Sequence, residues 1–302
     1  MPNGTLRHDP KRGAILMVIA CVMFVMMSAI VKDLAERLPF MEVMFFRCAL
    51  AIPLVLVFSV RTGVVSLRTR RLGAHVARAC TGMIAMSCAF FSLTVLPLAE
   101  QSALTQTTPI FATILAIPLL GERPGVARWT AVGLGFVGIM AIAMGQGAFW
   151  GGGTRDLIVT LGFAAALVHG IFSALTTLLV RSLSGTESSS TIVLWQSLLM
   201  SSMIGLTLPF IWVTPSWPDV LLLLGCGLFG GIAQVMLTEA WASSEVSAVA
   251  PFAYSSLLWA ALFGWVFWGE LPGLWTWVGS GLIVAAGLGM LRAELRRKRT
   301  KA

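Results

Sequence analysis

The sequence predicts an all-α polytopic membrane protein with ten transmembrane helices, arranged as two inverted five-helix repeats around a central cavity. The first observation is composition: mean hydropathy is +0.88, and 57% of the residues are hydrophobic while 11% are charged. Soluble domains carry about a quarter charged residues. The second is a series of apolar runs along the whole chain, and the third is a connector that occurs twice, GERPGVARW and GELPGLWTW.

The apolar runs are long enough to cross a hydrocarbon core of roughly 30 Å. Each must be helical, because lipid offers no partner for backbone N–H and C=O groups. A barrel strand would alternate, and a run such as AILMVIACVMFVMMSAIV does not. The first span follows a short basic tail without a clear cleavage site, so it is interpreted as a retained helix. The expected spans are 13–31, 39–60, 74–94, 98–119, 127–146, 156–180, 190–211, 219–240, 247–268 and 274–292.

The basic residues predict the orientation. Of the 21 Lys and Arg residues, 17 fall on segments that face one side, Arg78 among them, and only Lys32, Arg37 and Arg155 face the other. This positive-inside bias predicts cytoplasmic termini in a bacterial inner membrane. The chain then divides into a cytoplasmic tail (1–12), a first repeat (13–146), a periplasmic linker (147–155), a second, inverted repeat (156–292) and a basic cytoplasmic tail (293–302), which we expect near anionic headgroups and not on nucleic acid.

The internal repeat extends beyond the connector. An offset of 148 pairs Gln106-Thr107-Thr108 with Tyr254-Ser255-Ser256, and an offset of 149 pairs MSAIVKDL at 27–34 with TTLLVRSL at 176–183. Because five is odd, the second copy begins on the opposite side of the membrane, and the halves are inverted. Inverted repeats are typical of secondary transporters, whose site lies near the midplane where the halves meet.

Two five-span halves, each with a Gly-Glu connector and a Gly-rich last helix (GLGFVG and GSGLIVAAG), resemble the EamA-type branch of the drug/metabolite transporter superfamily. The resemblance covers nearly the whole chain. It implies that spans 1–4 and 6–9 surround a central cavity, with the fifth and tenth spans outside it. It also implies export of small metabolites, amino acids prominently, and the aromatic-rich spans resemble the aromatic amino-acid exporters of that group.

Polar residues deep in the spans are the candidates for binding a solute, since they usually face a bundle interior. Gln106 and Tyr254 occupy equivalent positions about eight residues into their helices, roughly 12 Å deep. We predict that both line the cavity. Beside them, Pro109 and Pro251 each remove a backbone hydrogen bond, which gives either a static kink for packing or a gating hinge.

Five further residues complete the predicted cavity lining. His169 could bind a carboxylate or a proton, or hydrogen-bond to a neighbouring helix. Arg47 could neutralise a substrate carboxylate, or pair with Glu42 or Glu100. The remaining three are Trp195, Gln196 and Gln234.

Several function classes lack their motifs. The chain contains no Walker A sequence, H-E-x-x-H, C-x-x-C or nucleophile elbow, so we expect no ATP-driven transport, no enzyme activity and no cofactor. The five cysteines show no paired spacing and are expected to be small buried hydrophobes, not metal ligands. No aspartate, and no glutamate away from the span ends, is expected in the membrane core, so tight proton coupling through a carboxylate is not expected. Few fixed charges also argue against a strongly anionic substrate.

The leading hypothesis is a secondary exporter of small metabolites, including aromatic or hydrophobic amino acids, that works by alternating access between the two repeats as a monomer or homodimer. Its partners are a small-molecule substrate and the lipid bilayer, without nucleic acid. A lipid-linked carrier or flippase, and a membrane scaffold without transport, are the alternatives.

Overall fold

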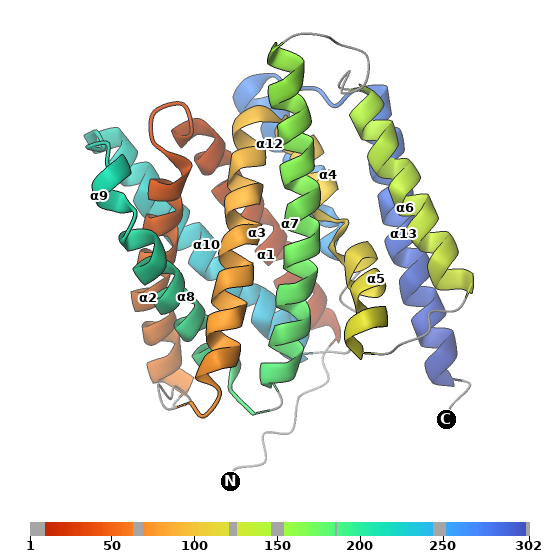
Figure 1. The fold of residues 1–302 in the computed structure, drawn as a ribbon, viewed down its shortest axis with the longest axis horizontal. Coiled ribbons are helices and arrows are strands. Elements are labelled where there is room, and N and C mark those ends of the chain that lie inside the picture. Colours follow the sequence, from red (N-terminus) through yellow and green to blue (C-terminus); the bar gives the residue numbers. More distant parts are fainter. Residues whose placement is uncertain are drawn as a thin grey trace.

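The computed structural model describes residues 10–62, 69–120, 126–145, 154–184, 186–243 and 252–299. Within these ranges the regular elements are all helices (Figure 1). The first half contains α1 (Pro10–Leu34), α2 (Phe40–Thr62), α3 (Leu72–Val95), α4 (Leu98–Thr105), α5 (Thr108–Leu120) and α6 (Val126–Gly145). The second half contains α7 (Thr154–Ser184), α8 (Ser189–Gly205), α9 (Leu208–Ile211), α10 (Trp217–Ser243), α12 (Ser255–Trp268) and α13 (Leu274–Arg299).

Each span expected from the sequence falls on one of these helices or on two consecutive ones. In the part of the chain that the structure describes, five helices are long and apolar enough to cross a membrane alone: α1, α2, α3, α7 and α10. The fourth span is broken between α4 and α5, and the seventh between α8 and α9. Part of the ninth, 244–251, lies outside the described residues. The helical fold is therefore confirmed, while ten crossings stay a prediction.

The two halves run in opposite directions. The corresponding helices α6 and α13 lie side by side and antiparallel (Figure 1). Their backbones touch at Gly138 and Gly279: a Cβ added to Gly279 would lie 2.5 Å from the carbonyl oxygen of Gly138. Only glycine fits at such a distance, so the glycines of these two Gly-rich helices let them approach closely.

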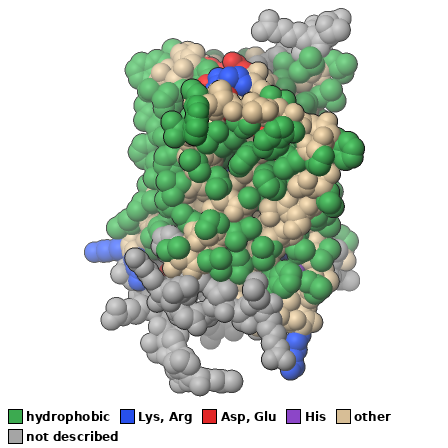
Figure 2. Space-filling view, turned by 90° about the vertical axis from the view of Figure 1, so that its left-hand side faces the viewer, with side chains coloured by type: hydrophobic (Ala, Val, Ile, Leu, Met, Phe, Trp, Pro, Cys, Tyr) green, Lys and Arg blue, Asp and Glu red, His purple; other side chains and the backbone are tan. Residues whose placement is uncertain are grey.

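The surface matches a lipid environment. Figure 2 shows a face on which hydrophobic side chains form a belt, with the visible basic and acidic side chains toward its two ends. The main core packs α1, α2, α3 and α10 through residues such as Val25, Met44, Ala79 and Cys226. We call the end formed by residues 35–39, 212–216 and 269–273 the upper end (Figure 1). Helix α1 begins and α13 finishes at the opposite, lower end, so an even number of crossings is consistent with the structure.

Helix boundaries follow local sequence at three places. Gly269, in the repeated connector, ends α12 in the left-handed conformation, with φ of 67°. Pro109 occupies the first turn of α5, directly after the break at Gln106 and Thr107. Helix α13 continues to Arg299, so the segment expected as a tail from residue 293 is helical over most of its length. Pro251 lies outside the described residues.

Candidate substrate-binding site

A polar cluster lies between α2, α3 and α8, inside the bundle. Its centre is Arg78, which is 5% exposed and donates a 2.6 Å hydrogen bond from Nη1 to Oε1 of Gln196. His75, one turn earlier on α3, lies beside the ring of Trp195 at a centroid distance of 5.8 Å. Arg47 of α2 packs against Gly230 of α10, and its charge acts on that of Arg78. We call these five residues the arginine cluster.

The arginine cluster contains many hydrogen-bonding atoms without a protein partner. Among the described residues, the Nε atoms of Arg47 and Arg78, both ring nitrogens of His75 and the indole Nε1 of Trp195 are buried and unpaired. Most are donors, and native proteins rarely leave such atoms unsatisfied. The arrangement is therefore suited to a ligand that supplies hydrogen-bond acceptors.

The sequence of α3 explains how the cluster forms. His75, Arg78 and Gly82 are spaced at i, i+3 and i+7, so they share one face of the helix. A Cβ at Gly82 would lie 3.5 Å from Nε2 of Gln196, which shows how closely α8 packs on that face. Helices α2 and α3 belong to the first repeat and α8 to the second, so the cluster lies where the halves meet.

Sequence reasoning missed two members of this cluster. Arg78 was counted with the basic residues of the lower-end segments, but it lies six residues inside α3, roughly 9 Å along the helix axis. That count also led to the expectation of few fixed charges near the site, which the buried Arg78 corrects. His75 was not singled out. The shared face of His75 and Arg78 was the signal that could have identified them.

A second polar region lies at the break between α4 and α5. Gln106 Nε2 donates hydrogen bonds to the carbonyl oxygen of Ala253, at 3.1 Å, and to Oγ of Ser256, at 2.6 Å. The two triplets paired by the internal repeat therefore touch each other. The side chain of Tyr254 points elsewhere, because a Cβ added to Gly287 of α13 would lie 1.4 Å from its hydroxyl oxygen. Tyr254 also lines an apolar pocket of about 480 Å³ between α12 and α13.

The remaining predicted residues lie apart from the arginine cluster. Nδ1 of His169 is 2.9 Å from the carbonyl oxygen of Ala85, which joins α7 to α3 roughly two helical turns from Arg78. Gln234 is half-buried on α10. The structure thus groups Arg47, Trp195 and Gln196, and it places Gln106, His169 and Tyr254 elsewhere.

The upper end is held by ion pairs between distant segments. Lys32 at the end of α1 pairs with Glu270 at 2.5 Å, and Glu270 also accepts from the backbone N–H of Leu98. Arg37 pairs with Asp219 at 2.9 Å and with Asp33. Because Arg37 lies between helices and donates to both carboxylates, its pKa is raised above the ordinary value for arginine.

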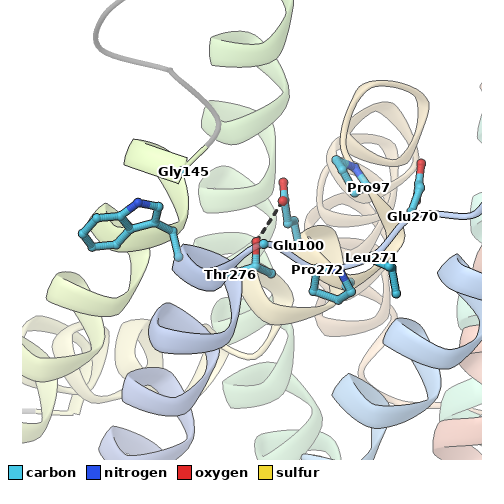
Figure 3. Close-up of a pocket in the computed structure, with 10 residues that line it drawn as sticks. Pro97, Glu100, Gly145, Glu270, Leu271, Pro272 and Thr276 are labelled. Atoms are coloured by element: carbon cyan, nitrogen blue, oxygen red, sulfur yellow. Dashed lines mark hydrogen bonds between the residues drawn. The ribbon is translucent and has the colours of Figure 1, made fainter.

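Two glutamates near helix starts are buried in protein. Glu42 is 0% exposed and accepts a 3.1 Å hydrogen bond from the N–H of Val213, and it does not pair with Arg47. Glu100 is 2% exposed and accepts a 3.0 Å hydrogen bond from Thr276, beside a pocket of about 320 Å³ (Figure 3). Both carboxylates lie at span ends, so neither contradicts the expectation that no carboxylate away from the span ends lies in the membrane core.

Comparisons with known proteins agree with this architecture. The profile of the EamA-like transporter family matches residues 11–144 and again residues 160–292. The chain is 32% identical to a riboflavin transporter of Rhizobium johnstonii, over 100% of this chain and 99% of that one. It is 31% identical to a riboflavin transporter of Vibrio cholerae, over 98% of each chain. It is 27% identical to a pseudopaline exporter of Pseudomonas aeruginosa, over 94% of this chain and 97% of that one.

Proposed function

The chain belongs to the EamA-like transporter family, which makes it a small-molecule transporter of a bacterial inner membrane and not an enzyme, and we propose that it carries riboflavin or a related planar heteroaromatic solute. Two full-length relatives that bear the name of riboflavin transporter support this choice. The solute binds at the arginine cluster, at the junction of the repeats.

The single observation that carries the proposal is the set of unpaired donors beside aromatic rings in this cluster. The isoalloxazine ring of an oxidised flavin is flat and has two carbonyl oxygens and two ring nitrogens that accept hydrogen bonds. Arg78, Trp195 and Gln196 can donate to such an edge, while the ring stacks against Trp195 or His75. Apolar walls with a few convergent polar groups are typical of small-molecule sites.

Amino-acid export, the finer expectation from the sequence, receives less support from the arginine cluster. A free amino acid carries an ammonium group, which needs acceptors or a carboxylate. In the part of the cluster that the structure describes, two arginines repel a cation and no carboxylate belongs to the group. Aromatic amino acids are therefore the comparison solutes for the test and not the proposed substrates.

The test is a counterflow assay in liposomes that hold the purified protein and an internal excess of unlabelled riboflavin. External labelled riboflavin should accumulate transiently, whichever direction transport takes in the cell. A matched experiment uses tryptophan and phenylalanine in place of riboflavin. Accumulation of labelled tryptophan together with none of riboflavin would overturn the proposal and restore amino-acid transport.

A further inference from the structure

The arginine cluster holds more positive charge than a neutral ring system requires. Arg78 is 5% exposed, Arg47 is half-buried, and their charges repel each other. Neither takes part in the ion pairs found among the described residues, which are Arg12–Glu239, Lys32–Glu270, Arg37–Asp33 and Arg37–Asp219.

Among the described residues, the groups that contact these two side chains are neutral. Arg78 donates to the amide oxygen of Gln196, and the side chain of Arg47 packs against Gly230 of α10. The negative charge of Glu187 acts on His75, and its carboxylate accepts a hydrogen bond from the hydroxyl of Thr69. A buried cation without a counter-charge is costly, and a second one beside it adds to that cost. An anion bound near these two side chains would relieve both penalties.

We infer, building on the flavin-type substrate proposed above, that Arg47, Arg78 and Gln196 form an anion-binding subsite for a carboxylate or phosphate group on the transported solute. A guanidinium group donates two parallel hydrogen bonds to such an anion, and the free Nε atoms of both arginines supply this geometry. Trp195 and His75 contact the ring system of the same solute. Because Arg47 and Arg78 lie on the first repeat and Gln196 on the second, the anion binds both halves at once.

The experiment compares three competitors that share one ring system in the counterflow assay. They are riboflavin, which is uncharged; riboflavin 5′-phosphate; and a flavin whose side chain ends in a carboxylate. Because charge-assisted hydrogen bonds are stronger than neutral ones, at least one of the anionic flavins should have an apparent affinity about tenfold or more above that of riboflavin. The two anionic compounds distinguish phosphate from carboxylate as the preferred group.

The variants Arg78→Gln and Arg47→Gln test where this preference comes from. In each variant the ratio of the apparent affinities for the anionic flavin and for riboflavin should fall close to one. Arg71→Gln is the matched control, since it removes the same charge from the lower end of α3, where Arg71 bonds to Ser182. The preference should persist in this control. Arg78→Lys keeps the positive charge but lacks the two parallel donors of the guanidinium group, so it should retain part of the preference for the anionic flavin.

The outcomes separate this inference from the proposed function. Equal competition by charged and uncharged flavins in the wild type would overturn the anion subsite and leave flavin transport standing. If no flavin competes or is transported, thermal unfolding with benzoate and phenyl phosphate decides. A rise in melting temperature in the wild type and the Arg71 variant, absent in the Arg78 and Arg47 variants, would support the subsite alone. No rise in any protein would overturn both.

Discussion

Charged groups at the upper end and in the arginine cluster are treated in opposite ways. At the upper end, Lys32 and Arg37 each meet a carboxylate from a distant segment. In the arginine cluster, Arg78 donates to a neutral amide, Arg47 packs against a glycine, and the two like charges repel each other. The upper end therefore resembles a structural contact between the halves, whereas the cluster resembles a site that awaits a ligand.

The physical reason for the difference is the cost of removing a charge from water. A paired charge recovers part of that cost from its partner, so loss of the partner destabilises the protein. A buried charge that has only neutral partners recovers less of that cost until an anionic ligand arrives, so its removal should cost little stability and much binding. Stability and transport should therefore respond differently to substitutions in the two regions.

Arg78→Met should show the largest functional effect. The variant removes a buried cation that has no counter-charge and keeps an unbranched apolar side chain. The free energy of unfolding should therefore stay within about 1 kcal/mol of that of the wild type, with a similar melting temperature. Riboflavin counterflow should fall about tenfold or more. Thermal unfolding in detergent and the transport assay measure the two quantities on one preparation. A loss of stability of about 3 kcal/mol would instead show that Arg78 has a structural partner.

Asp219→Asn should show the largest effect on stability. Asp219 is 5% exposed and accepts hydrogen bonds from Nε of Arg37, at 2.9 Å, and from the N–H and hydroxyl of Ser216. Weakening these charge-assisted bonds should cost about 2 kcal/mol. Asp33→Asn is the matched control, since Asp33 binds the same arginine but its side chain is 44% exposed. The control should cost about 0.5 kcal/mol or less; equal losses in the two variants would contradict the distinction.

The sequence predicted the helical fold because its signals are local or repeated. Apolar runs identify helices, and the duplicated connector with its Gly269 cap reveals the two halves. It missed Arg78 because charge counting treats every basic residue near a helix end as a loop residue. Whether Arg78 faces headgroups or α8 depends on packing across the repeats, which no window of one helix contains. The ion pairs at the upper end depend on the same long-range packing.

The repeat also predicted that Gln106 and Tyr254 share one environment, and the structure separates them. Gln106 donates two hydrogen bonds to the start of the ninth expected span. The hydroxyl of Tyr254 lies against Gly287 and has no hydrogen-bond partner among the described residues. Equivalent positions in an inverted repeat have equivalent backbones, but their side chains meet different neighbours.

Gln106→Leu and Tyr254→Phe should have the smallest effects on stability and transport. They compare a hydrogen-bonded side chain, Gln106, with a side chain that makes no hydrogen bond among the described residues, Tyr254. Gln106→Leu removes two hydrogen bonds to α12 and its preceding turn, so it should cost about 1–2 kcal/mol in thermal unfolding. Tyr254→Phe removes a hydroxyl that bonds to no described protein group, so stability should change by less than about 0.5 kcal/mol.

Riboflavin counterflow shows whether Tyr254 only packs or also binds the solute. In the packing case the Tyr254 variant transports within about twofold of the wild type. A threefold to tenfold loss of apparent affinity, about 0.5–1.5 kcal/mol, would instead show that the phenol reaches the solute during the transport cycle, as the repeat predicts.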